Sequence, residues 1–479
     1  MKLFGKINLS GDTIDAPKRK DYIIYVILFL IPFASMMYGD MKAFTHYEVN
    51  FWGSIFEGGG IKNFYEYGND MISYYRANNI GGAYELIYDF PVYILLGIWG
   101  APLWMFCHIT GIEETSSMWT MLYAKSIYLV ALAITAYLIY FICKNIKVSE
   151  INSKWAAYLF LSSATVFVEI GIVGQLDILA FPFLLLGIFY YQRKKYNRFI
   201  IFFSIAVSFK QFPLFIFVPL LLLYEKNIIK IIYKAILVLL VTIIAGIGFP
   251  QNTAATDIKS EIRNHFLEAF LGNKLSLYNG VVPLVVVMFG IICVYCYLTR
   301  VESEEDYFYY SILIPLVVMF VILISFDSNP YWFVYLSPFL ALVMAYNSGN
   351  FKFLILFESI GMMGLVLNQY GGNYWVYETD WAKGMMLERL FGSPEYLITL
   401  KVFNSYTKMD YLSPVFFAIF VVCIATVIWL SRPKKCSQND NVPIRRYAIL
   451  RMLLNVGIAL IPEFVYLLSF PLGKYLMNR

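Results

Sequence analysis

The sequence predicts an all-α protein, a polytopic bundle of transmembrane helices. Apolar residues make up 60% of the 479-residue chain, and charged residues make up only 14%, whereas a soluble globular protein carries about 25% charged residues. The apolar residues form repeated runs near the length of about 20 residues that a helix needs to cross a bilayer. Lys and Arg gather in short clusters between these runs, as they do in cytoplasmic loops. The net charge of +5 is modest and forms no basic block, so we expect no nucleic-acid partner.

Hydropathy and the placement of basic residues together predict about 13 helices. The expected spans are 22–38, 117–142, 155–173, 176–192, 235–249, 281–299, 308–325, 331–346, 351–368, 413–431 and 447–469. The stretch 199–225 is too long for one crossing and carries Lys210 and Pro213 near its middle, which favours a broken helical hairpin with its tip on the outer side. The run 91–108 is apolar, but if it crossed, Lys144 and Lys147 would lie outside. We therefore expect it to be an interfacial or re-entrant helix on the outer side.

This topology divides the chain into three parts. Residues 1–21 form a cytoplasmic tail, 22–346 a transmembrane module with the outer loop 39–90 and the helix 91–108, and 347–479 a C-terminal set of helices with the outer loop 369–412. The segments 250–280 and 326–331 are expected on the outer side as well. The inner connections are short and basic, so the features that could carry chemistry are concentrated on the outer side.

The first such feature is Asp40, which follows the end of the first helix. A carboxylate held against the membrane face could act as a general base toward a hydroxyl. The alternative is a solvated Asp that ends a helix. His46 and Glu48 follow in the same loop and could bind substrate, although ordinary loop polarity explains both.

Two acidic residues lie beside helix starts. Tyr88 and Asp89 precede Pro91, and Pro is well suited to the first turn of a helix. This segment is either a simple helix start or an aromatic and acidic rim on a substrate cavity. Gln175 and Asp177 stand at the start of another membrane helix, where an ionisable residue is costly and usually functional or paired. A helix cap at an outer turn is the alternative.

The remaining candidates lie at two later breaks. Lys210 and Gln211 separate two apolar half-helices, and a buried cation at a broken helix is a natural site for the phosphate of a lipid. A Lys that extends to the interface is the alternative. Asn329 and Tyr331 lie in a tight outer connection rich in aromatic residues. They are either substrate contacts or part of an aromatic belt.

Together these features resemble the GT-C superfamily of membrane glycosyltransferases, and most closely the bacterial and PIG-M-like mannosyltransferases that use polyprenyl-phosphate sugars. In that family an acidic residue follows the first helix, as Asp40 does. A Tyr-Pro-Pro-like segment precedes an interfacial helix, as at 88–93, and a Gly-Gln-x-Asp segment opens a middle helix, as at 174–177. A Lys near a Pro breaks a later helix pair, and a Pro-x-Tyr-like turn follows, as at 329–331. The likeness covers residues 20–345.

The resemblance implies an inverting enzyme of the cell membrane that transfers mannose or another hexose on the extracytoplasmic face. The donor would be a polyprenyl-phosphate sugar, and the acceptor a glycan, lipid or cell-wall hydroxyl. Asp40 would be the general base and Lys210 would bind the donor phosphate. A single Asp40 replaces the Asp-x-Asp pair of some members, so the need for a divalent cation (Mg²⁺ or Mn²⁺) is left open. The alternatives are a flippase or transporter for a lipid-linked saccharide, and a polysaccharide polymerase or ligase.

Overall fold

The computed structural model describes residues 16–35, 40–251, 253–278, 280–326, 328–373, 376–377, 386–433 and 444–477. The described residues are 81% helical, which confirms the all-α prediction. Among the described residues, five helices are long and apolar enough to cross a membrane, or up to nine if each bent pair is one span. Further apolar helices are shorter. These helices indicate a membrane protein, while the total of about 13 stays a prediction.

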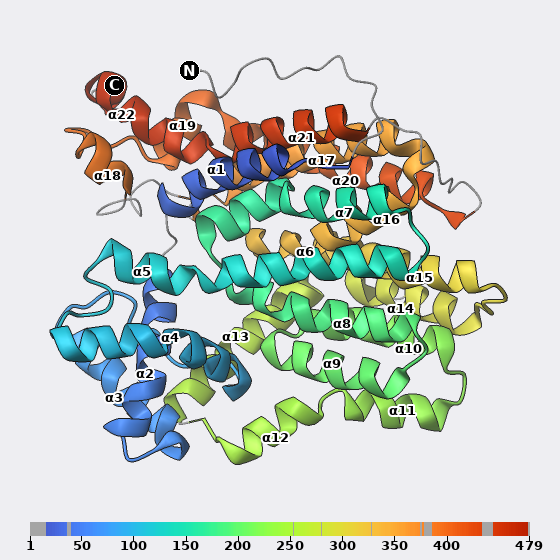
Figure 1. The fold of residues 1–479 in the computed structure, drawn as a ribbon, viewed down its shortest axis with the longest axis horizontal. Coiled ribbons are helices and arrows are strands. Elements are labelled where there is room, and N and C mark those ends of the chain that lie inside the picture. Colours follow the sequence, from blue (N-terminus) through green and yellow to red (C-terminus); the bar gives the residue numbers. More distant parts are fainter. Residues whose placement is uncertain are drawn as a thin grey trace.

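The N-terminal region begins with a helix that packs against Val166–Val173 and Ile444–Ala459, and it continues with a group of helices at one end of the molecule. Its elements are α1 (Arg19–Ser35), α2 (Asp40–Phe56), a 3-10 turn (Ile61–Asn63), α3 (Phe64–Ala77) and α4 (Phe90–Thr110). α2 is bent by 90° from α1, and Figure 1 shows α2 and α3 at the left end of the molecule. The predicted end of the first helix, 36–38, lies outside the described residues. The predicted outer loop 39–90 is therefore largely helical.

α4 corresponds to the run 91–108 that we expect not to cross. By length and composition alone it could span a membrane. However, α5 (Met118–Lys125) and α6 (Ile127–Asn145) form one apolar segment of 28 residues. Lys125 donates a hydrogen bond to the carbonyl of Phe33, near the end of α1, at 2.9 Å. The end of α1 thus lies beside the start of the α5–α6 segment. The chain that connects them, which includes α4, therefore does not need to cross the bundle. This geometry supports an interfacial α4, which stays a prediction.

The next predicted pair of helices is interrupted. It consists of α7 (Glu150–Leu161), a π-helical segment (Val166–Val173), a 3-10 segment (Leu176–Ala180) and α8 (Phe181–Gln192). The prediction of one continuous helix at 155–173 is wrong, because α7 and the π-helical segment meet at an angle of 47°. Serine side chains bond to the backbone at the break: Ser162 donates to the carbonyl of Tyr158, and Ser163 accepts from the amide of Val166. Such bonds compete with regular helix pairing.

The helix break predicted within 199–225 is confirmed, while the outer position of the hairpin tip stays a prediction. α9 (Tyr196–Phe209) and α10 (Phe212–Tyr224) run antiparallel. The first residue of α9 and the last residue of α10 lie side by side, with the rings of Tyr196 and Tyr224 stacked at a centroid distance of 3.8 Å. Lys210 has an extended backbone at the tip. Pro213 lies in the first turn of α10, where its missing N–H costs no helical hydrogen bond.

The elements that follow lie at the edge of the bundle. They are α11 (Ile228–Leu237), α12 (Leu240–Gly248), α13 (Thr253–Gly272), β1 (Lys274–Leu277), β2 (Gly280–Pro283) and α14 (Leu284–Leu298). The predicted span 235–249 is replaced by two helices bent by 40°. The predicted outer segment 250–280 contains α13 and β1, which pairs antiparallel with β2. The helix predicted from 281 begins at Leu284, because the preceding residues belong to this hairpin.

The C-terminal part adds several long helices, joined by short helices and 3-10 turns. They are α15 (Glu304–Ser325), a 3-10 segment (Pro330–Leu336), α16 (Ser337–Tyr346), a 3-10 turn (Ser348–Asn350), α17 (Phe351–Gly372), α18 (Met386–Phe391), α19 (Leu400–Thr407), α20 (Met409–Leu430), α21 (Ile444–Ala459) and α22 (Ile461–Met477). α17 packs closely on α20 through glycines: a Cβ at Gly364 would meet the carbonyl oxygen of Phe416 at 2.6 Å. Small residues permit such close helix packing in membranes. The predicted span 447–469 is a pair bent by 48°.

The predicted inner connections meet at one end of the bundle. The guanidinium of Arg193 donates to Asn145 at 3.2 Å, and Lys147 pairs with Glu304 at 3.5 Å. α2, α3 and α18 lie toward the opposite end (Figure 1). The fold therefore separates the two groups of connections, as the topology requires.

Candidate functional site

The candidate site begins with Asp40 at the first residue of α2. Gln175, from the connection between the π-helical segment and the 3-10 segment, donates its side-chain N–H to Asp40 Oδ2 at 2.9 Å. Gly174 precedes it with φ +71°, a conformation that glycine adopts at little cost. This turn directs the 1%-exposed Gln175 side chain toward Asp40. Residues far apart in the sequence thus share one hydrogen bond.

A buried ion pair lies in the same region. Lys210 Nζ, at the tip of the α9–α10 hairpin, is 3.4 Å from Asp177 Oδ2. The Asp177 side chain is fully buried, and neither of its carboxylate oxygens has a hydrogen-bond partner among the described residues. The buried hydroxyl of Tyr335 lies next to the Asp177 carboxylate. A carboxylate has about four lone-pair sites, more than Lys210 and Tyr335 can occupy, so Asp177 has remaining capacity to bind a polar ligand.

Tyr88 completes the site. Its ring centroid is 5.4 Å from Lys210 Nζ, a cation–π distance. The backbone of Tyr88 is fixed on both sides: its N–H donates to the hydroxyl of Tyr93, and its carbonyl accepts from Tyr65 and Gln251. The ring is therefore held over the hairpin tip.

These side chains form what we call the outer cluster: Asp40, Tyr88, Gln175, Asp177 and Lys210. It combines a carboxylate that can accept a proton, a cation that can hold a phosphate, and an aromatic face suited to a sugar ring. Each member was a candidate from the sequence. What the sequence did not reveal is that Gln175 bonds to Asp40 while Asp177 pairs with Lys210.

Other sequence candidates at the same end have different partners. Asp89 pairs with Lys259 of α13 at 2.6 Å. Gln211 is exposed, next to the hairpin tip. Asn329 donates to the hydroxyl of Tyr331 at 3.0 Å, within their own turn. The described contacts do not join these four residues to the outer cluster.

His46 and Glu48 lie farther along α2. Six residues of helix advance about 9 Å and turn the side chain by about 600°, so His46 points away from the side of α2 that carries Asp40. The Cβ of Glu48 lies 2.6 Å from the position that a Cβ on Gly100 of α4 would occupy. Its Oε2 is buried and has no hydrogen-bond partner among the described residues. Neither side chain contacts the outer cluster in the described structure.

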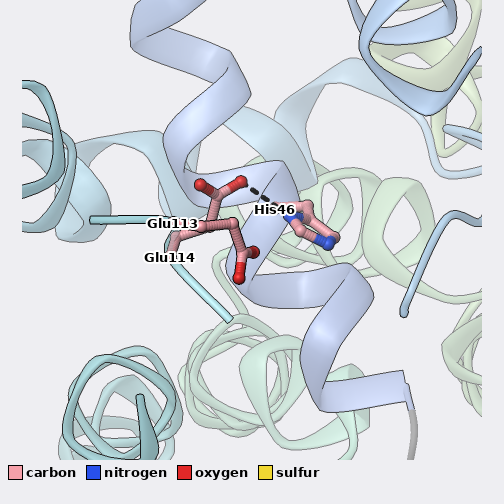
Figure 2. A group of neighbouring side chains, drawn as sticks. All are labelled: His46, Glu113 and Glu114. Atoms are coloured by element: carbon pink, nitrogen blue, oxygen red, sulfur yellow. Dashed lines mark hydrogen bonds and ion pairs between the residues drawn. The ribbon is translucent and has the colours of Figure 1, made fainter. Parts of the chain in front are cut away.

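His46 belongs to a second group with Glu113 and Glu114, shown in Figure 2. One potential ligand atom from each side chain lies within 4.8 Å of the others. His46 Nδ1 is 2.6 Å from Glu114 Oε1, and Nε2 is 2.9 Å from the carbonyl oxygen of Gly81. The hydroxyl of Tyr75 donates to the same Glu114 oxygen at 2.7 Å. The group links α2, α3 and the connection between α4 and α5.

Imidazole and carboxylates are ligand types that suit Zn²⁺ or Mn²⁺. Here, however, the ring nitrogens of His46 are both occupied, and Glu113 accepts from the amide and hydroxyl of Thr115. Burial alone raises the pKa of Glu114, but the hydrogen bonds from His46 and Tyr75 and the charge of His46 outweigh burial and hold that pKa below its usual value. Hydrogen bonds thus occupy both ring nitrogens of His46. A metal ion that binds to His46 would have to displace a proton from one of these nitrogens.

Sequence reasoning missed Lys125, Tyr335 and the acidic partners of His46. Lys125 did carry a signal, because it is a lone ionisable residue inside an apolar run. The pairing of Glu114 with His46 had no sequence signal, since 68 residues separate them. Tyr335 is one of many aromatic residues and has none either.

The fold and the site define an all-α bundle, with helices of membrane-spanning length, that carries a buried polar cluster at one end. No family model matches the chain, and no curated protein matches it. A narrower assignment therefore depends on the chemistry of the outer cluster and on the sequence motifs.

Proposed function

We propose that the protein is a membrane glycosyltransferase of the GT-C type. It transfers a hexose, such as mannose, from a polyprenyl-phosphate donor to a hydroxyl of a glycan, lipid or cell-wall acceptor on the extracytoplasmic face of the cell membrane. One observation carries this proposal: Asp40 and Lys210, from distant parts of the chain, lie close enough at the end of the bundle for their charges to interact. A carboxylate and a cation held together in this way suit displacement of a phosphate by a hydroxyl.

In the proposed reaction, the acceptor hydroxyl attacks the anomeric carbon of the donor sugar and its proton passes to the Asp40 carboxylate. The bond between the anomeric carbon and the phosphate oxygen breaks, and polyprenyl phosphate leaves with the bonding electrons. Lys210 stabilises the charge that develops on this leaving group. The donor's hydrocarbon tail stays in the bilayer, so the reaction has to occur at the membrane surface.

The other members of the outer cluster orient these groups. Gln175 holds one oxygen of Asp40 and leaves the other for the acceptor. Asp177 keeps Lys210 in place before the donor binds, and the remaining lone pairs of its carboxylate can accept hydrogen bonds from sugar hydroxyls. The ring of Tyr88 offers an apolar face to the sugar.

The decisive variant is Asp40→Asn, purified in lipid nanodiscs and assayed with a panel of polyprenyl-phosphate sugars. We expect the rate of transfer to fall by about 10²–10⁴-fold, the usual contribution of a general base. Asp70→Asn is the matched control, because Asp70 is an exposed carboxylate on α3. Full transfer by Asp40→Asn with any donor that the wild type uses would remove Asp40 from the mechanism.

Lys210→Ala tests the phosphate role. We expect weaker use of the phosphate-linked donor, seen as a lower kcat/KM, while the KM for the acceptor changes little. Lys62→Ala is the control, since Lys62 is an exposed cation in the same outer region. Unchanged donor kinetics in Lys210→Ala would contradict the assignment.

A further inference from the structure

Lys125 is a fully buried cation at the junction of α5 and α6. Its ammonium group donates to the main-chain carbonyls of Phe33, Gly171 and Ile172 at 2.9, 2.6 and 3.2 Å. It also lies 4.7 Å from the centroid of the Phe33 ring. A Lys inside an apolar segment is costly and needs a compensating role. These three acceptors are backbone atoms of two other segments, and the buried carboxylate of Glu463 on α22 lies close enough to interact with the ammonium charge.

Both segments lead directly to the outer cluster. Phe33 is near the end of α1, shortly before Asp40, and Gly171 and Ile172 are in the last turn of the π-helical segment, shortly before Gln175. The last carbonyls of a helix have no partner within the helix, and a cation is favourable at that end. Lys125 thus joins the ends of the two helices that precede Asp40 and Gln175.

The Lys125 side chain also packs against the turn that carries Gln175. A Cβ placed on Gly174 would lie 2.9 Å from Lys125 Cε and 3.0 Å from the sulfur of Met41. Met41 is the neighbour of Asp40. Lys125, the Gly174 turn and the start of α2 therefore pack tightly around one point, and Gln175 bonds to Asp40 beside it.

We propose that Lys125 is a positioning residue that sets the distance between Gln175 and Asp40. It touches neither substrate nor the reacting atoms. It acts by holding the backbone on both sides of the Gln175–Asp40 hydrogen bond. The effect on catalysis rests on the proposed function, whereas the effect on the two backbone segments does not.

The test compares Lys125→Met, Lys125→Arg and a matched control in lipid nanodiscs. Met has a similar length but no N–H donors, while Arg keeps cationic donors. The control is the double variant Arg451→Met/Glu358→Met. Arg451 is another buried cation that donates to backbone carbonyls, those of Leu159 and Ser162, and it pairs with Glu358. Removing both charges leaves no unpaired carboxylate, while the carbonyls of Leu159 and Ser162 lose a cationic donor, as the acceptors of Lys125 do in Lys125→Met.

Two readouts are measured for each variant on the folded fraction. The first is the split between kcat and the donor KM for glycosyl transfer. We expect Lys125→Met to lower kcat at least tenfold with the donor KM within twofold, Lys125→Arg to recover part of kcat, and the control to keep kcat within twofold. The second is hydrogen exchange of the amides at 40–44 and 171–175. We expect faster exchange there in Lys125→Met and unchanged exchange there in the control.

The two readouts separate the inference from the function on which it rests. Faster exchange in Lys125→Met with no transfer activity in any variant, wild type included, would refute the glycosyltransferase proposal and keep the backbone role of Lys125. Wild-type kcat in Lys125→Met overturns the positioning role. Wild-type exchange at 40–44 and 171–175 overturns it equally. An equal fall of kcat in the control also overturns it, because the effect would then reflect general loosening of the bundle.

Discussion

The Lys210–Asp177 pair allows a stability prediction that does not depend on the function. At 3.4 Å two unit charges attract by about 5 kcal/mol at an effective dielectric constant of about 20, before the cost of desolvation. Lys210→Met leaves Asp177, which is 0% exposed, without its counter-ion. Breaking a buried pair in this way typically costs about 3–5 kcal/mol. We expect a value near the lower end, about 3 kcal/mol, because the Lys210 side chain keeps 18% of its surface exposed.

The converse change should cost less. Asp177→Asn keeps the shape of the side chain, and the partly exposed Lys210 can turn toward water, so we expect about 1 kcal/mol. The double variant removes both charges and should be about 2 kcal/mol more stable than the sum of the single effects predicts. The assay is a double-mutant cycle followed by tryptophan fluorescence during denaturant unfolding in mixed micelles. Additivity within about 0.5 kcal/mol would refute the ion pair.

Three further outcomes are expected. The pKa of Glu114 is held below its usual value in the fold. Its pair with His46 therefore stabilises the protein fully above the unfolded pKa of a Glu carboxyl, and this stability is lost as the pH falls through the lowered pKa. Glu114→Gln should lower the Tm at pH 7, and the difference in Tm from the wild type should shrink as the pH is lowered step by step; a difference that does not change with pH would contradict the pairing. Gly174→Ala should lower the free energy of unfolding by about 1–2 kcal/mol, since φ is +71° there. Gly246→Ala on α12 is the control and should not destabilise the protein, because no atom lies within 4 Å of the added Cβ. Equal stability of the two variants would show that the turn at Gly174 is not strained. Because both ring nitrogens of His46 are occupied, EDTA should leave the Tm unchanged, and a chelator-induced fall that Mn²⁺ or Zn²⁺ restores would establish a metal site.

Much of the outer cluster could be predicted from single positions. Lys210 beside Pro213 predicted a helix break, because Pro cannot continue a helix and a cation avoids the apolar interior. Asp40 and Asp177 stood out for the same reason, as carboxylates at the edges of apolar runs. The composition and run lengths also predicted the helical bundle. Each of these signals is local in the sequence.

Other features had no local signal. The break at Ser162 depends on side-chain hydrogen bonds that compete with the helix, and serine occurs in many unbroken helices. The sequence did not indicate that Asp89 pairs with Lys259 of α13. Nor did it indicate that six residues of helix turn His46 away from Asp40 and toward Glu114. In each case the partner lies far away in the sequence.

By itself the sequence determined that this chain forms apolar helices of membrane-spanning length and places a few charged residues at their ends. It could do so because burial of polar groups in hydrocarbon is costly, and this constraint acts on every run separately. Only the tertiary structure decided which charged residues meet: Asp40 with Gln175, Lys210 with Asp177, and Lys125 with the backbone of two other helices. These pairings depend on how bent helices pack, and that packing is set by contacts between segments distant in the chain.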